Sequence, residues 1–483
     1  MKNYSLSLLA LFSTALIFTS CSDDDNAQII NQGEEAGDVE EAGEEISAVG
    51  AVYAMTNGEG QVAGVEQGPN SIITYSRAAD GTLTPIGPVL TGGNGGDFDG
   101  GEGLDPLISA YALTKTRDNS FMLAVNAGSN TITALPINED YSLGEPQSIG
   151  TSAVGPNSID SYPAPESMEG VNSLVLVTNI TRQEFLAGGE PMHRGTLDAF
   201  WLLDSGSFQS AGDSVDLDNR PSCVYISPDG AYAIVASINA GAAGLDVGAT
   251  DNTGADSTAI GNQDEVVLFS INGGNLTRLD GVTSTLRGNA DQRNLPSAIG
   301  SQIIEGADGN LYAVVTEARE FQYNGAPPAF NALQDGSVST WRIQGSELIP
   351  VSLDIASGEN NTGRTACWLD FTADNSAFFV SNAIEAGLAS YSFNNGVIEL
   401  INGTIVSGIG APATAPTVEG ETPFDETQGW IDMWISDDGE FLYQLYGLDG
   451  TIGIFRIEGN SLIPVEEVRG NLPENNTQGI VAI

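Results

Sequence analysis

The side chains of this chain that can do chemistry are mainly carboxylates. Its 483 residues include 64 acidic and 15 basic side chains and one histidine, for a formal net charge of −49. A single histidine, His193, excludes mechanisms that need two, including most zinc sites. A field this negative repels phosphate backbones, so nucleic acid is not an expected partner.

One glycine-rich segment gathers acids at a spacing that could hold a cation. It contains Asp97, Asp99, Glu102 and Asp105. Carboxylates separated by glycine can wrap Ca²⁺, which prefers oxygen ligands. The spacing of an EF-hand is absent, and a solvated acidic surface is the simpler interpretation of the same residues. The sequence therefore requires no cofactor and leaves Ca²⁺ at this segment as an open alternative to a solvated acidic surface.

The N-terminus reads as an export signal. Lys2 is followed by an apolar run from Leu6 to Phe18, which is shorter than the roughly 20 residues of a membrane-spanning helix. Small residues then lead to Cys21, and the whole of residues 1–21 resembles a bacterial lipoprotein signal that ends at a lipidated Cys21. The alternative is an ordinary secretory signal with an incidental cysteine.

Residues 22–50 are predicted to form a flexible acidic tether. The stretch has ten acidic residues and no basic ones, so it buries too little apolar surface to fold. Its start, Ser22-Asp23-Asp24-Asp25, resembles acidic signals that send lipoproteins to the cell surface. The expected location is therefore the cell envelope, as a surface-exposed outer-membrane lipoprotein.

Residues 51–483 contain one four-stranded unit repeated seven times. Turns such as Ser227-Pro228-Asp229-Gly230 separate short β-rich runs, which indicates hairpins. Naming the strands of each unit a to d, strand b is expected at 51–56, 121–126, 174–179, 232–237, 311–316, 377–382 and 441–446. Strand c is expected at 71–76, 130–135, 197–202, 265–270, 337–342, 388–393 and 451–456.

The first unit lacks a strand a, and the C-terminal run 477–483 lacks a strand b. The unpaired C-terminal run can supply the strand that the first unit lacks, so it should enter the first unit and close a ring. The predicted fold is all-β, a seven-bladed β-propeller of four-stranded blades, expected to be monomeric. A tandem of β-sandwiches would not produce seven units with a split first copy. A calcium β-roll would need repeated nonapeptides, and only the glycine-rich segment 92–97 resembles one.

The long connections in this scheme are all of two kinds, b to c and d to the next a. Both kinds emerge at the same end of an antiparallel blade, so one face around the channel mouth should carry them. Cys223 and Cys367 are expected to be buried small hydrophobes rather than a disulfide. Trp368 and Trp430 are expected to pack in the core or the channel wall.

Several motifs then resemble a known family. The run Asn126-Ala127-Gly128-Ser129-Asn130-Thr131-Ile132, the Ser227–Gly230 turn and Thr365-Ala366-Cys367-Trp368 look like the lactonase-type seven-bladed propellers. That family includes the 3-carboxy-cis,cis-muconate lactonizing enzymes (carboxymuconate cyclases) and the 6-phosphogluconolactonase-like propellers. The resemblance implies a site of Arg, His and Glu side chains on the channel face.

This chain keeps only part of that site. Blade four reads Pro221-Ser222-Cys223 where the family has Pro-Arg-His, and its strand b ends without the family's Asn-Glu. In blade five, Glu317 does match the family's Glu. Arginines that stand near channel-mouth positions are Arg220, Arg293 and Arg364 before strands a, and Arg319 after a strand b.

Two functions follow from these residues. The first is an enzyme acting on a small lactone or organic acid, with Glu317 as the catalytic base and Arg220, Arg293 and Arg364 gripping a substrate carboxylate. The second is a non-catalytic surface propeller that binds a protein, a glycan or a cation. Salt bridges to the abundant acids would account equally for the arginines.

Overall fold

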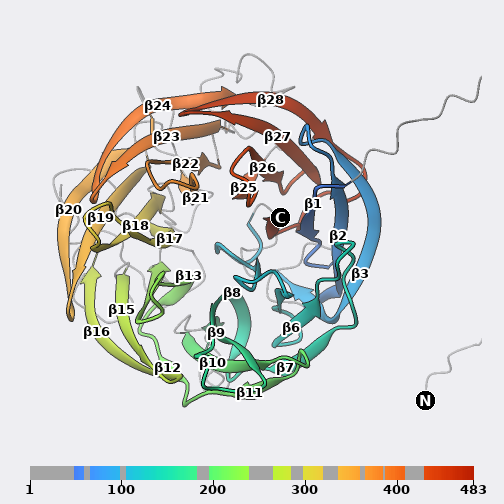
Figure 1. Ribbon diagram of the computed structural model, residues 1–483, viewed down its shortest axis with the longest axis horizontal. Coiled ribbons are helices and arrows are strands. Elements are labelled where there is room, and N and C mark those ends of the chain that lie inside the picture. Colours follow the sequence, from blue (N-terminus) through green and yellow to red (C-terminus); the bar gives the residue numbers. More distant parts are fainter. Residues whose placement is uncertain are drawn as a thin grey trace, which may run out of the picture. The chain divides into compact units, whose positions relative to one another are not determined.

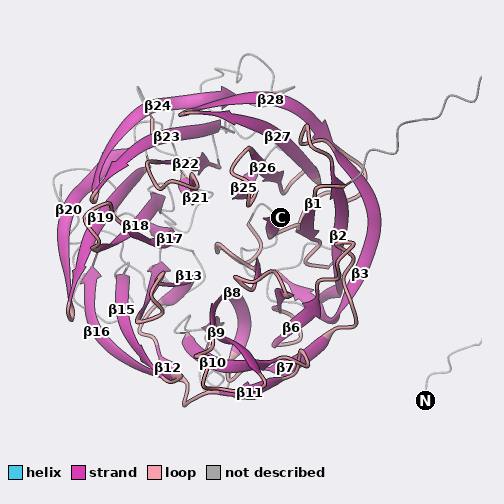
Figure 2. Ribbon diagram, viewed as in Figure 1, coloured by secondary structure: helices cyan, strands magenta, loops and turns pink. Residues whose placement is uncertain are grey.

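The computed structural model describes residues 48–58, 66–97, 105–181, 195–238, 265–283, 297–318, 336–358, 365–383, 387–407 and 429–483. These residues form seven antiparallel sheets arranged as a ring (Figure 1). The regular structure that they contain is strand throughout (Figure 2), and none of it is a helix long and apolar enough to span a membrane. The predicted signal and the start of the tether, residues 1–47, lie outside the described residues.

Each sheet is one blade, and its strands run from a at the centre of the ring to d at the rim. The innermost strands a are β29 (Ile480–Ala482), β4 (Leu113–Lys115), β8 (Val154–Pro163), β13 (Arg220–Ile226), β17 (Ser297–Glu305), β21 (Ala366–Phe371) and β25 (Trp430–Ile435). The strands b are β1 (Gly50–Met55), β5 (Phe121–Asn126), β9 (Val171–Thr181), β14 (Tyr232–Ile238), β18 (Leu311–Ala318), β22 (Ala377–Asn382) and β26 (Phe441–Tyr446).

The two outer positions complete the blades. The strands c are β2 (Glu66–Arg77), β6 (Thr131–Pro136), β10 (Thr196–Leu203), β15 (Glu265–Asn272), β19 (Ser337–Gln344), β23 (Gly387–Asn394) and β27 (Thr451–Glu458). The strands d are β3 (Leu83–Gly96), β7 (Gln147–Gly150), β16 (Asn275–Thr283), β20 (Glu347–Ala356), β24 (Val397–Ser407) and β28 (Ser461–Val468). In blade three this position is divided between β11 (Phe208–Ser210) and β12 (Val215–Asp216).

The predicted propeller and its closure are confirmed. All seven predicted b strands and all seven c strands are present, and most begin within a residue or two of the expected position. In blade one, β29 pairs antiparallel with β1, with Val52 opposite Ala482 and Ala54 opposite Ile480. The C-terminus therefore supplies strand a of the first blade, and no inner edge is left open there.

The a–b turns show why the chain reverses where it does. In blade four, Asp229 Oδ1 accepts hydrogen bonds from Ser227 Oγ at 2.6 Å and from the Ala231 amide at 3.0 Å. Gly230 then takes a positive φ of 70°, which costs glycine nothing. The same hydroxyl–Asp pair closes the a–b turns that begin at Thr116, Thr372 and Ser436. These local hydrogen bonds thus set the position in each of these blades at which strand a ends and strand b begins.

The core lies between neighbouring blades. Strands b are almost wholly buried, because both of their faces pack on adjacent sheets. Cys223 and Cys367 are free and buried, as expected. Trp430 is 0% exposed and Trp368 is 2% exposed, which confirms that both are packing residues.

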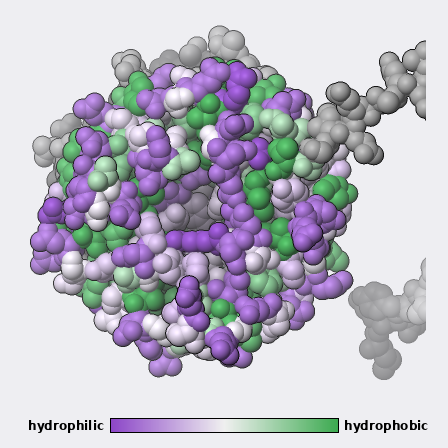
Figure 3. All heavy atoms as spheres, viewed as in Figure 1, coloured by the Kyte–Doolittle hydropathy of each residue, from purple (hydrophilic) through white to green (hydrophobic). Residues whose placement is uncertain are grey.

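The two ends of the blades define two faces of the ring. We call the end with the b–c and d–a connections the d–a face, and the end with the a–b and c–d turns the a–b face. Every segment after residue 58 that lies outside the described residues belongs to a b–c or a d–a connection. The surface drawn in Figure 3 is largely hydrophilic, with scattered hydrophobic residues, and is hollowed near the middle of the ring.

Candidate functional site

A short irregular segment crosses the central channel. Residues Asp105–Tyr111, which we call the channel plug, precede β4 and are all buried. The plug hydrogen-bonds to five blades. Its partners include Asn157 and Ile159 in blade three, Arg220 and Ser222 in blade four, Gln302 in blade five, Trp368 and Leu369 in blade six, and Gln478 just before β29.

Two side chains hold most of the plug in place. Tyr111 donates its hydroxyl hydrogen to the Leu369 carbonyl at 3.0 Å and accepts one from Gln302 Nε2 at 2.8 Å. Gln478 Nε2 donates to Asp105 Oδ1 at 2.7 Å and to the Ser109 carbonyl at 2.8 Å. The channel is therefore bridged by protein, and a ligand at its mouth meets the plug.

The plug has an uncommon backbone. Ile108 has φ 46° and Tyr111 has φ 60°. A β-branched residue rarely adopts this left-handed conformation, which costs on the order of 1–3 kcal/mol and persists only where the surroundings enforce it. The contacts to five blades are what enforce it here.

Arg220, a predicted substrate-binding residue, begins strand β13 and is 0% exposed. Its Nη2 donates to the carbonyl of Leu107 in the plug at 2.8 Å. A guanidinium keeps its charge in a protein, so this position holds a permanent buried cation against the plug. In this arrangement Arg220 positions the plug.

Glu317, the predicted base, is fully buried near the end of β18. Its Oε2 accepts a hydrogen bond from Ser337 Oγ at 2.5 Å, and the two residues stand opposite each other in the b–c ladder. In three other blades the residue near the end of strand b, opposite the first residue of strand c, is an asparagine: Asn126, Asn179 or Asn382.

These asparagines tie strands together. Asn179 Nδ2 donates to Thr196 Oγ1 at 2.9 Å and to Asp198 Oδ2 at 3.0 Å, both on strand c of its own blade. Asn126 donates to Thr131 and Thr133 on strand c of its own blade and also bonds to the preceding blade, and Asn382 bonds to Ser357. The contact between Glu317 and Ser337 follows the pattern of Asn179, from strand b outward to strand c.

Only some of the other predicted site residues belong to the part of the chain that the structure describes. Arg293, Arg364, Arg319, His193, Asp99 and Glu102 lie outside the described residues. Asp97 and Asp105 are buried, and Asp105 Oδ1 accepts hydrogen bonds from Gln478 and from the Ser109 amide. Within the described ranges, no group of three His, Cys, Asp or Glu side chains could hold a metal ion.

Three aspartates with raised pKa values were not among the site residues predicted from the sequence. Asp160, Asp370 and Asp432 lie on inner strands, and each accepts a backbone N–H from the next blade, either from its strand a or, for Asp432, from the residue just before β29. The donors are Ile226 at 2.6 Å, Ile435 at 2.7 Å and Gly479 at 2.9 Å. Burial raises the pKa of Asp160 and of Asp370 to about 6, and that of Asp432 to about 7. In the sequence, these residues could have been noticed as acids that stand inside the β-rich runs of inner strands.

Solved structures share this fold at low sequence identity. A Bacteroides uniformis protein provisionally named a 6-phosphogluconolactonase matches with TM-score 0.53 and 14% identity, over 90% of this chain and 99% of its own. A periplasmic gluconolactonase from Pseudomonas aeruginosa matches with TM-score 0.51 and 14% identity, over 88% of this chain and 98% of its own. A hypothetical selenium-binding protein from Sulfolobus tokodaii matches with TM-score 0.53 and 12% identity, over 90% and 93%.

These likenesses concern the fold alone. The chain is a seven-bladed β-propeller, and the solved structures that share this fold carry names of different functions. No protein-family model matches the chain, and no curated protein matches it by sequence.

Proposed function

We propose that this protein is an exported lactonase-type propeller that opens a small lactone, or acts on a related organic acid, at the channel mouth of the d–a face. The observation that carries the proposal is Arg220. A permanent cation, 0% exposed, lies at the inner end of a strand a in a chain of net charge −49. Positive charge at this mouth is what an anionic substrate would need to approach such a protein.

The chemistry assigns a role to each candidate side chain. In opening a lactone, water adds to the carbonyl carbon while a base takes a proton from that water. The bond between the carbonyl carbon and the ring oxygen then breaks, and the base returns the proton to this oxygen, which becomes an alcohol beside the new carboxylic acid. Glu317 is the proposed base, oriented by the hydroxyl of Ser337. Arg293 and Arg364 are proposed to hold a substrate carboxylate, while the buried Arg220 is proposed to add positive charge near the mouth and to fix the plug through the Leu107 carbonyl.

The same proposal includes the setting of the enzyme. We place it in the cell envelope as an outer-membrane lipoprotein lipidated at Cys21, with the acidic segment after Cys21 as a tether. A P. aeruginosa structural neighbour carries the name of a periplasmic enzyme, which is in keeping with lactone chemistry in an envelope. No cofactor is proposed as essential, and weak Ca²⁺ binding by the loop from Asp97 to Asp105 remains a proposal.

A second candidate is a non-catalytic surface propeller. The observation that favours it is the position of Glu317, which matches that of the strand-tying Asn126, Asn179 and Asn382 and bonds outward to strand c. If Glu317 only ties strands, the d–a face would bind a partner without turnover.

A pair of matched variants separates the two candidates. Glu317→Gln keeps a hydrogen-bond acceptor for Ser337 but removes the base, so we expect kcat/KM on small lactones to fall by about 10²-fold or more. Asp198→Asn alters another buried carboxylate near the start of a strand c, which contacts Asn179 and Ser152. This control should lower stability but leave turnover per folded molecule unchanged.

The same two variants can also contradict the proposed role of Glu317. Equal turnover by wild type and Glu317→Gln would remove Glu317 from the mechanism. Equal loss in both variants, in step with lost folding, would assign Glu317 a structural role and favour the second candidate.

A further inference from the structure

One side-chain amide ties the channel plug to a carboxylate of blade six. Gln302 Nε2, on β17, donates to the Tyr111 hydroxyl at 2.8 Å and to Asp370 Oδ1 at 3.1 Å. Asp370 stands on β21, and its Oδ2 accepts the Ile435 amide of blade seven at 2.7 Å. The plug is thus connected, through Gln302, to a group that can change its charge.

The charge of Asp370 decides which way this amide points. An ionised carboxylate only accepts hydrogen bonds, so the Nε2 end of Gln302 has to face it. Gln302 is 4% exposed and Tyr111 is 7% exposed, so water does not readily replace a bond that either side chain loses. Ionised Asp370 therefore fixes the amide in the orientation that also serves Tyr111.

The surroundings of Asp370 place its titration in a useful range. Desolvation raises the pKa of Asp370 to about 6, while hydrogen bonds from backbone amides and from Gln302 lower it. The ionisable groups that face it are Tyr111 of the plug, Tyr225 of β13 and Lys115 of β4. The pKa of each tyrosine is raised, so both stay neutral and Lys115 is the charged neighbour.

The direction of the coupling follows from linkage. Because the bond from Gln302 favours the ionised form of Asp370, ionisation in return strengthens that bond. A hydrogen bond to a charged group is roughly twice as strong as a neutral one. Desolvation acts on global stability in the opposite sense, because it favours the protonated carboxyl in the folded protein. Within the folded protein, however, the plug is held more firmly at higher pH.

We propose that Asp370 is a pH-sensitive latch, which holds the plug when ionised and loosens it when protonated. In the ionised state Gln302 donates to Asp370 and to Tyr111, and Tyr111 donates to the Leu369 carbonyl. A proton from solvent turns Asp370 into a donor, which favours a rotated amide whose Oε1 faces both partners. Tyr111 then donates to Gln302, and the plug loses its bond to Leu369. This latch does not depend on the proposed lactone chemistry.

The test is amide hydrogen exchange in the plug of the full mature protein at pH 5 and pH 8, followed by mass spectrometry and corrected for intrinsic rates. The plug amides that have acceptors in the structure are those of Leu107, Ile108, Ser109 and Ala110. Asp432 also contacts the plug, at the Tyr111 amide, so each variant is compared with wild type at the same pH. Asp370→Asn cannot ionise, so its plug should exchange about fivefold faster than wild type at pH 8 and within about twofold of it at pH 5.

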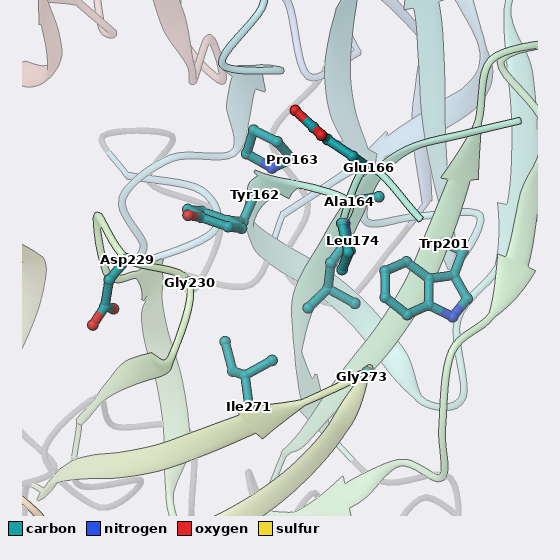
Figure 4. Close-up of a pocket in the computed structure, with 12 residues that line it drawn as sticks. Tyr162, Pro163, Ala164, Glu166, Leu174, Trp201, Asp229, Gly230, Ile271 and Gly273 are labelled. Atoms are coloured by element: carbon teal, nitrogen blue, oxygen red, sulfur yellow. The ribbon is translucent and has the colours of Figure 1, made fainter. Parts of the chain in front are cut away.

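Asp160→Asn is the matched control. Burial also raises the pKa of Asp160 to about 6, and its Oδ2 accepts the Ile226 amide of the next blade at 2.6 Å. Its strand β8 ends at Tyr162, which lines a cleft between blades three and four on the a–b face (Figure 4), and its charged neighbour is Arg117. Among the described residues, its hydrogen-bond donors are two backbone amides outside the plug. Plug exchange in this variant should therefore stay within about twofold of wild type at both pH values.

A second variant keeps the test decisive if Asp370→Asn does not fold. Gln302→Leu removes the connection but leaves Asp370 in place, so its plug should exchange about fivefold faster than wild type at pH 8 and differ less at pH 5. Wild-type exchange in Asp370→Asn at pH 8 would overturn the latch. So would a ratio of variant to wild type that is the same at both pH values, because Asp370 would then support the plug whatever its charge.

Discussion

At the residue scale, the inner wall of the ring depends on buried acids. Asp160, Asp370 and Asp432 each accept a backbone N–H from the next blade, so each carboxyl joins two inner strands. Satisfied in this way, the groups are tolerated in a core that would otherwise exclude them. Burial still disfavours their charged form, which couples the fold to pH.

Asp432 gives the clearest pH prediction. Burial raises its pKa from 3.8 to about 7, so unfolding releases a proton from this group between those values. Its contribution to stability is complete below about pH 4, falls as pH rises through the folded pKa, and is constant above it, at roughly 1.4 kcal/mol for each unit of difference. Asp432→Asn cannot ionise, so the free energy of unfolding of this variant relative to wild type should rise between about pH 4 and pH 7.

Urea denaturation of both proteins across this range measures the difference directly. Parallel pH profiles would show that Asp432 does not titrate there.

The candidate site was only partly predictable at this scale. The motif resemblance singled out Glu317 and the channel-mouth position singled out Arg220, and the structure buries both near the d–a end of neighbouring blades. Their orientations were not predictable. Arg220 is held by a carbonyl of Leu107, a contact across 113 residues that no local pattern encodes.

At the element scale, the channel plug joins blades that are distant in the sequence. Tyr111→Phe removes the hydroxyl that links Leu369 to Gln302 across the channel, and we expect a loss of about 1–3 kcal/mol in the free energy of unfolding, because buried partners are left unsatisfied. Tyr225→Phe is the comparison, since its ring packs at 5.9 Å from that of Tyr111 but outside this bridge. A smaller loss in Tyr111→Phe than in Tyr225→Phe would contradict the bridging role.

The closing strand β29 supports a second prediction at this scale. Deleting 477–483 removes strand a of blade one and also Gln478, which holds Asp105 and Ser109 of the plug. We expect the truncated protein to aggregate or to melt many degrees earlier, because an inner edge and buried apolar surface become exposed. A melting curve identical to that of the full chain would show that the ring does not depend on this strand.

Elements with a local signal were the predictable ones. Hydroxyl–Asp turns and β-rich runs located strands b and c in all seven blades, because each hairpin is specified by its own residues. The divided outer strand of blade three and the plug were not predicted. Both depend on contacts between blades, and the plug backbone at Ile108 departs from any local preference.

At the scale of the whole molecule, the net charge bears on how the protein could be attached to a membrane. A net charge of −49 keeps a protein dispersed but gives it no affinity for anionic surfaces, so the proposed membrane attachment needs a source other than charge. A lipidated Cys21 is that proposed source. Cys21→Ala should move the protein from the membrane fraction to the soluble fraction of cells, as detected by fractionation and immunoblotting. Unchanged membrane partition would contradict the lipoprotein proposal.

The central claim is that the channel mouth of the d–a face opens lactones. The most direct measurement is proton release on incubating the full mature protein with a panel of small lactones, including aldonolactones and carboxylated unsaturated lactones, against a buffer blank. The account predicts saturable turnover of at least one member, with a rate proportional to protein concentration. Rates equal to the blank for every member, from protein that melts cooperatively, would contradict it and leave the surface-binding propeller as the better description.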